Sequence, residues 1–276
     1  MSVAFVSKTR RSWAKRYRHV QWGERIPKQF RLALPSVITV FGMCLGLSAI
    51  RFAFAGTFEY AVICVLAASL FDVADGRVAR FLGSESDFGA ELDSLADFLC
   101  YGVAPSVMAY FFTLSHWAGV GWPLCLFFTT CSALRLARFN VYRLLPAKVP
   151  WGDRFFIGLP APGGAFVALL PFMIYFACGV TWIFPWSFLL TLALGGGLMV
   201  SRLPTLALKR FRFSKRQLPL VLLMASLVTG GLLSAPWSFA AVLVVGYIAS
   251  MPLSVLWIRR HYGRRAHLDP KQPKAS

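Results

Sequence analysis

Charged residues are scarce in this chain, and acidic residues are the scarcer of the two kinds. Of its 276 residues 14% are charged, against about 25% in an average soluble domain. Only 11 residues are Asp or Glu, and none of them lies between Asp153 and Asp269. Hydrophobic residues make up 57% of the chain instead. This balance excludes an ordinary soluble domain and indicates that the chain lies in a lipid bilayer.

The six cysteines and four histidines form none of the usual metal or redox patterns. The cysteines stand singly in apolar segments without a Cys-x-x-Cys pair, which argues against disulfide or zinc frameworks. The histidines lie near the ends of the chain or in a link between apolar runs. The first residues lack an apolar core followed by a small-residue cleavage site, so we expect no removable signal peptide.

Apolar runs recur along the sequence at about the length that a bilayer requires, which is roughly 20 residues. They cover residues 35–54, 57–75, 90–112, 120–141, 161–178, 182–200, 217–234 and 237–257. We therefore predict an all-α fold, a polytopic membrane helix bundle of about eight transmembrane helices. The transmembrane domain is expected over 35–258, between a basic amphipathic segment at 1–34 and a disordered basic tail at 259–276.

The distribution of basic residues predicts the orientation of these spans. With the N-terminus in the cytoplasm, 28 of the 29 Lys and Arg residues fall on the cytoplasmic side, and only Arg51 falls on the other. This agreement with the positive-inside rule places both termini in the cytoplasm. Topology and attraction to anionic membrane lipids thus explain the formal charge of +18, and we expect no nucleic-acid partner. Residues 8–31 fit an interfacial helix and equally a solvated basic arm.

Seven of the 11 acidic residues fall in the 26-residue window from 72 to 97. A lone Asp in the middle of a membrane helix costs roughly 2.5 to 3.5 kcal/mol, so a cluster of acids there requires compensating cations. One helical stripe carries Asp72, Asp75, Gly76, Ala79 and Arg80, and a second carries Gly89, Asp93 and Asp97. Glycine and serine between the stripes indicate a helix end, a turn and a new N-cap, so the stripes belong to antiparallel neighbours.

Four carboxylates on facing helices predict a site for hard divalent cations. Oxygen ligands without His or Cys suit Mg²⁺, Mn²⁺ or Ca²⁺. Four carboxylates suffice for two ions about 3.5–4 Å apart, an arrangement that stabilises both the attacking and the leaving oxygen of a phosphoryl displacement. The small residues on the same stripes leave room for a flat ligand, although small residues in membrane helices also serve close helix packing.

Residues 72–97 read D-x2-D-G-x2-A-R-x8-G-x3-D-x3-D, which resembles the signature of the CDP-alcohol phosphotransferase family at every position it specifies. The resemblance implies that Asp72, Asp75 and Asp93 bind divalent metal. It further implies that Asp97 completes the metal site and acts as the general base. Mg²⁺ or Mn²⁺, as two ions, is the expected cofactor, with Ca²⁺ as a non-productive ligand.

The resemblance also implies how the nucleotide is bound. Gly76, Ala79 and Gly89 would admit the cytidine nucleotide, and Arg80 would help to hold its diphosphate. The acceptor hydroxyl would lose its proton to Asp97 and attack the β-phosphorus in line, so that CMP departs.

Four further segments, 97–105, 135–140, 156–162 and 199–205, make the chain most similar to the integral-membrane family members that use serine. The implied substrates are CDP-diacylglycerol and L-serine. Arg135 and Arg138, an i, i+3 pair, are candidates to bind the serine carboxylate or a phosphate, or they extend to the membrane surface. Ser36 stands where many relatives have Asn, which leaves one family contact in doubt. Residues 156–164 fit a ligand-binding segment and equally a re-entrant turn.

Two other functions stay open at this point. A sister enzyme would use choline or a polyol phosphate, and the nine tryptophans are compatible with an aromatic choline site. A divalent-cation transporter would also place acids in the membrane, but at several depths and on several helices. We further expect a homodimer in the bacterial cytoplasmic membrane, with its active site facing the cytoplasm.

Overall fold

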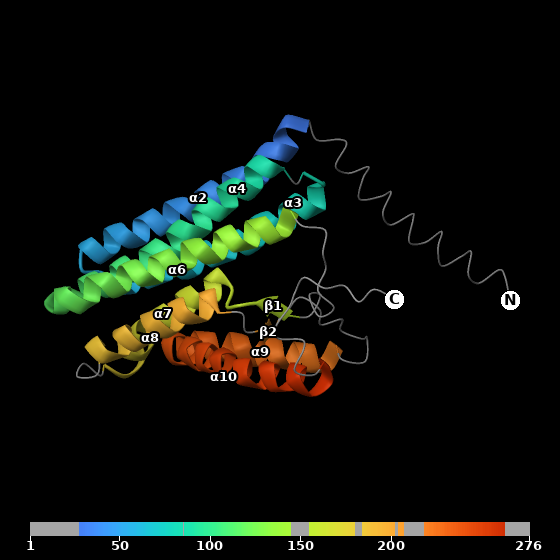
Figure 1. Cartoon of the computed structure of the whole chain (residues 1–276). Coiled ribbons are helices and arrows are strands. Elements are labelled where there is room, and N and C mark those ends of the chain that lie inside the picture. The colour runs from blue at the N-terminus through green and yellow to red at the C-terminus, as the bar shows by residue number, and fades with distance from the viewer. Residues whose placement is uncertain are drawn as a thin grey trace, which may run out of the picture.

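A computed structural model describes residues 28–84, 86–144, 155–179, 184–201, 204–206 and 218–262 of the chain. The predicted basic segment 1–34 and the tail 259–276 lie largely outside these residues. The described chain is almost entirely helical (Figure 1). Its helices are α2 (Lys28–Phe54), α3 (Phe58–Leu82), α4 (Asp87–Asp97), the π-helix η1 (Phe98–Val103), α5 (Ala104–Phe112), the 3₁₀-helix η2 (Leu114–Trp117), α6 (Ala118–Leu144), α7 (Ala161–Cys178), α8 (Phe184–Val200), α9 (Leu218–Ser234) and α10 (Pro236–Tyr262).

The helical fold class is confirmed, and each predicted apolar run overlaps a helix or the continuous unit α4–η1–α5. Within the described residues, four helical segments are long and apolar enough to cross a membrane: Ala33–Phe54, Asp87–Phe112, Gly119–Val141 and Ala161–Cys178. The helix α3 falls short because Glu59, Asp72 and Asp75 interrupt its apolar sequence. The chain is therefore an integral membrane protein, while the count of eight spans remains a prediction.

The helices lie side by side in two groups (Figure 1). One group contains α2, α3, the α4–η1–α5 unit and α6, and the other contains α7 to α10. Contacts of α6 with α8, and of α3 and α5 with α7, join the two groups. Within the first group, α2 packs against both α3 and α4, so that it can contribute side chains to a site between them.

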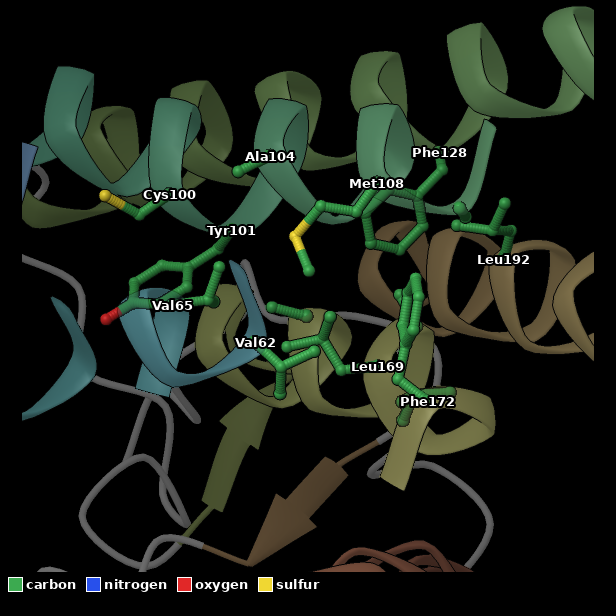
Figure 2. Packing of buried hydrophobic residues seen from close by; sticks show 14 of the residues in the cluster. Val62, Val65, Cys100, Tyr101, Ala104, Met108, Phe128, Leu169, Phe172 and Leu192 are labelled. Carbon is green, nitrogen blue, oxygen red and sulfur yellow. The ribbon is translucent and has the colours of Figure 1, made fainter. Parts of the chain in front are cut away.

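An aromatic cluster fills the centre of the bundle where α3, α5, α7 and α8 meet. The ring centroid of Phe172 lies 4.7 Å from that of Phe188 and 5.0 Å from that of Phe112. Both pairs are edge-on, a favoured geometry for aromatic pairs. Aliphatic side chains from several helices, such as Val62 and Leu169, extend the same core (Figure 2). The core therefore fixes the positions of α3 and of the α4–η1–α5 unit, which carry the motif.

Two three-residue strands form a small antiparallel pair that the sequence did not predict. Strand β1 (Phe155–Ile157) pairs with β2 (Pro204–Leu206). Gly158 follows β1 with φ of +80°, and a Cβ there would stand 2.7 Å from the Ser201 carbonyl oxygen, so only glycine fits. The Leu159 N–H then donates to the Leu198 carbonyl at 3.1 Å. The segment before α7 is thus attached to the C-terminal end of α8.

Candidate active site

The turn between α3 and α4 connects the two predicted stripes. Gly83 caps the C-terminal end of α3, and its left-handed backbone (φ 59°) turns the chain so that the Ser84 N–H also donates to the Ala79 carbonyl, at 3.0 Å. α4 begins after Ser86, whose hydroxyl oxygen accepts a hydrogen bond from the Gly89 N–H at 3.0 Å. A glycine at a helix end and a serine N-cap are the residues that these positions favour. The predicted helix end, turn and N-cap are therefore confirmed.

Three of the four predicted aspartates converge between α3 and α4. Carboxylate oxygens of Asp72 and Asp75 on α3 and Asp93 on α4 lie within 4.8 Å of one another. Asp75 is 5% exposed, and the other two side chains are half-buried. Carboxylates this close repel one another, and oxygen donors without His or Cys match the ligand preference of Mg²⁺, Mn²⁺ and Ca²⁺. The donor set therefore fits the divalent metal that the motif implies.

The fourth aspartate, Asp97, ends α4 and lines the same pocket as the other three. It stands outside the closest group but interacts electrostatically with Asp72, Asp93 and Asp75. It also interacts with the guanidinium of Arg135 on α6. Asp97 thus shares one pocket and its electrostatic environment with the other three aspartates.

The pocket lies between α3 and α4 and has α2 and η1 as further walls. Its lining residues are Thr39, Gly42, Ala68, Asp72, Asp75, Asp93, Ala96, Asp97, Cys100 and Tyr101. The space among these residues is about 220 Å³, including the open space at its mouth. The four acids thus share one small recess with Thr39 and Tyr101.

Two hydroxyl groups in this pocket contact the aspartates, and sequence reasoning missed both. Thr39 Oγ1 on α2 lies 2.6 Å from Asp75 Oδ2. The Tyr101 hydroxyl, on η1, donates to Asp72 Oδ2 at 3.2 Å. Neither residue belongs to the spaced motif, and each lies on a different helix from the carboxylate that it contacts. The one available signal for Thr39 was a polar residue one turn into an apolar run.

The π-helix η1 explains how Tyr101 reaches the site. In an α-helix, side chains four residues apart drift by about 40° around the axis, because each residue turns by about 100°. A π turn is wider and rotates less per residue, so Tyr101 returns toward the face of Asp97. The Gly102 carbonyl in this turn accepts hydrogen bonds from Ser106 Oγ at 3.1 Å and Thr129 Oγ1 at 3.3 Å. Such hydroxyls stabilise an irregular turn within a membrane helix.

The small residues of the motif differ in the space around them. A Cβ built on Gly76 would have a single neighbour within 4 Å, Arg80 Nη2 at 3.8 Å, so this position is open. A Cβ on Gly89 would meet Ser86 Oγ at 3.1 Å and Ser36 Oγ at 4.0 Å, close to the helix cap. Arg80 is exposed, and its Nε donates to the carbonyl of Gly76 at 2.8 Å. Ala79 is half-buried on the same helix.

The two candidate arginines of α6 have different surroundings. Arg138 donates from Nη1 to the Val200 carbonyl at 2.9 Å and from Nη2 to the Met199 carbonyl at 3.0 Å, at the C-terminal end of α8. A cation there bonds to the last carbonyls of a helix and interacts favourably with its dipole. Arg135 lies 5.3 Å from the Phe139 ring centroid and interacts electrostatically with Asp97. Arg135 therefore interacts with the acids at long range, whereas Arg138 connects α6 to α8.

Comparison with known proteins identifies the group to which this arrangement belongs. The family model of the CDP-alcohol phosphatidyltransferases matches residues 32–194, which include all four aspartates. The chain belongs to this family. Among its relatives, a CDP-diacylglycerol–serine O-phosphatidyltransferase of Mycobacterium leprae is 34% identical over 233 residues, which cover 83% of this chain and 77% of the relative.

Two other bacteria have similar proteins of the same name. The relative from Helicobacter pylori strain 26695 is 35% identical over 198 residues, 70% of this chain and 80% of its own length. The relative from Bacillus subtilis is 36% identical over 140 residues, 50% of this chain and 75% of its own length. The matched lengths show that the likeness extends well beyond the short aspartate motif.

Proposed function

We propose that this protein transfers the phosphatidyl group of CDP-diacylglycerol to the hydroxyl of L-serine, which yields phosphatidylserine and CMP. The observation that carries the proposal is that all four motif aspartates line one pocket. Membership of the CDP-alcohol phosphatidyltransferase family supports the reaction type, and the names of the relatives support serine as the acceptor.

The acidic residues would divide the chemistry between them. Asp72, Asp75, Asp93 and Asp97 would hold two divalent ions, Mg²⁺ or Mn²⁺, which offset charge on the diphosphate. Asp97 would receive the proton of the serine hydroxyl. The serine oxygen then forms a bond to the β-phosphorus, and the bond from that phosphorus to the CMP oxygen breaks. In this scheme the protein's groups position the substrates and deprotonate the serine hydroxyl, so no covalent enzyme intermediate is required.

The remaining site residues would bind the substrates. The open position at Gly76, together with Ala79 and Gly89, would admit the cytidine nucleotide beside the acids. Arg80 is exposed next to Gly76 and would contact the diphosphate. Arg135, which interacts electrostatically with Asp97, would bind an anionic substrate group, either the serine carboxylate or a phosphate.

The membrane arrangement is also part of the proposal. We propose eight spans with both termini in the cytoplasm of a bacterial cell, because 28 of 29 basic residues then lie on that side. The active site would face the cytoplasm, where CDP-activated lipid and serine meet, and the enzyme would act as a homodimer. Accessibility of single cysteines introduced near His116 and after Arg259 tests the orientation, since the proposal requires opposite sides for these two positions.

One assay tests the proposed reaction. Membranes containing the protein are supplied with CDP-diacylglycerol and Mg²⁺ or Mn²⁺, and in turn with serine, glycerol 3-phosphate, inositol phosphate and choline. We expect CMP release with serine and a loss of about 10²–10⁴-fold in the Asp97→Asn variant. Glu91→Gln, an exposed acid on the same helix, is the matched control and should keep full activity. Release with choline alone would overturn the serine assignment, and a fully active Asp97→Asn variant would remove the proposed base.

A further inference from the structure

Thr39 is a buried hydroxyl that one of the proposed metal ligands contacts directly. Its side chain is 6% exposed, and its Oγ1 lies 2.6 Å from Asp75 Oδ2 and 3.0 Å from the Pro35 carbonyl. A hydroxyl has one proton to donate. Both neighbours of this hydroxyl are acceptors, and the shorter distance favours donation of its proton to Asp75. An ionised carboxylate only accepts hydrogen bonds, which fixes Thr39 as the donor of this pair.

Tyr101 makes the corresponding contact to the other aspartate of α3. Its hydroxyl donates to Asp72 Oδ2 at 3.2 Å, and its side chain is 1% exposed. The ring packs in the core beside Val65, while the hydroxyl oxygen stands at the edge of the cluster (Figure 2). Because the ring is enclosed and η1 sets its direction, the hydroxyl has little freedom to move away from Asp72.

The two hydroxyls lie before and after the motif in the sequence, and each contacts one of the two aspartates of α3. Thr39 is on α2, before the motif, and Tyr101 is on η1, after it. The terminal torsion of an Asp side chain is broad, so an unsupported carboxylate can rotate away from a metal. A hydroxyl that donates a hydrogen bond to one carboxylate oxygen restricts that rotation. A hydroxyl is also neutral, so it does not offset the negative charge of the carboxylate as the cation of Lys or Arg would.

We propose that Thr39 and Tyr101 are positioning residues, which orient Asp75 and Asp72 for binding the divalent ions. This inference rests on the metal site of the proposed function and does not depend on which alcohol is the acceptor. Hydrogen-bonding partners of metal ligands typically contribute about 10–100-fold in metal affinity. The Thr39 contact should contribute more than the Tyr101 contact, because it is shorter and its partner Asp75 is more buried than Asp72.

Metal affinity tests the inference without any turnover. Mn²⁺ is titrated into the purified full-length protein in lipid nanodiscs, and free Mn²⁺ is counted by its electron paramagnetic resonance signal. We expect Thr39→Val, which removes the hydroxyl and keeps the branched shape, to raise the Kd for Mn²⁺ by about 10–100-fold. Thr39→Ser keeps the hydroxyl and should restore most of the affinity. Tyr101→Phe should raise the Kd at the lower end of the same range.

The outcomes separate this inference from the proposed function. Wild-type affinity in both Thr39→Val and Tyr101→Phe would overturn the inference, as would a Thr39→Ser variant that binds as weakly as Thr39→Val. The Tyr101→Phe variant, whose ring still fills the core, keeps the test decisive if Thr39→Val fails to fold. If the wild-type protein itself binds no Mn²⁺, or binds it equally well after Asp93→Asn, the metal site of the proposed function fails instead.

Discussion

Truncation of Arg138 should destabilise the bundle and leave serine binding intact. Arg135 and Arg138 on α6 were both candidates for the acceptor, but Arg138 donates to two carbonyls at the end of α8, at 2.9 and 3.0 Å. The Arg138→Ala variant therefore loses a connection between α6 and α8, while Arg135 keeps its electrostatic interaction with Asp97.

The magnitude follows from these two hydrogen bonds. A hydrogen bond to a charged group contributes about 1.5–3 kcal/mol, so the gross loss is about 3–6 kcal/mol. Arg138 is half-buried, and water at the freed carbonyls recovers part of this, which leaves a net cost of about 2–3 kcal/mol. For a chain of this size the melting temperature should fall by roughly 4–12 °C.

Thermal unfolding in detergent, followed by size-exclusion retention, measures the effect, and CMP release against serine concentration gives the KM. Arg77→Ala is the matched control, because Arg77 is exposed on α3, and it should melt like the wild type. Arg135→Ala should show the reverse pattern, with a small change in melting temperature and a large loss in the rate of CMP release. An Arg138→Ala variant that melts normally but has a raised KM for serine would refute the reasoning.

Three further predictions follow from the site and its surroundings. Gly76→Ala should fold normally, since the new methyl has open space, but should raise the KM for CDP-diacylglycerol; an unchanged KM would show that the space is not used. Gly102→Ala should cost about 1–3 kcal/mol in thermal unfolding, because its Cβ would stand 2.9 Å from Ser132 Oγ. Adding Ser132→Gly should recover most of that loss, and no recovery would contradict the steric account. EDTA should abolish CMP release, with recovery in Mg²⁺ or Mn²⁺ but not in Ca²⁺, and full activity in EDTA would argue against a metal site.

Local sequence patterns predicted the parts of the site that depend on neighbours along the chain. The stripes on α3 and α4 follow from helical spacing, and the turn between them follows from Gly83 and Ser86. These features need only a few adjacent residues, so one sequence suffices to find them. The same logic gave the helical class, because long apolar runs have few other structures available in a bilayer.

The features that sequence reasoning missed all depend on residues far apart in the chain. Thr39 and Asp75 are 36 positions apart, Tyr101 and Asp72 are 29 apart, and Arg138 and Val200 are 62 apart. No local pattern marks such pairs. The π turn and the β1–β2 pair are similar cases, because neighbouring helices and hydroxyl groups stabilise them more than local propensity does.

The place of Thr39 also bears on how a newly made chain enters the bilayer. α2 precedes α3 in the sequence, so a partner with a hydroxyl for Asp75 is already present when the acidic helix leaves the ribosome. Asp75 then has one hydrogen-bond partner in the bilayer before any ion is bound. We expect cells starved of manganese and magnesium uptake to accumulate inserted but inactive protein, which regains activity when the ions are supplied after synthesis has stopped.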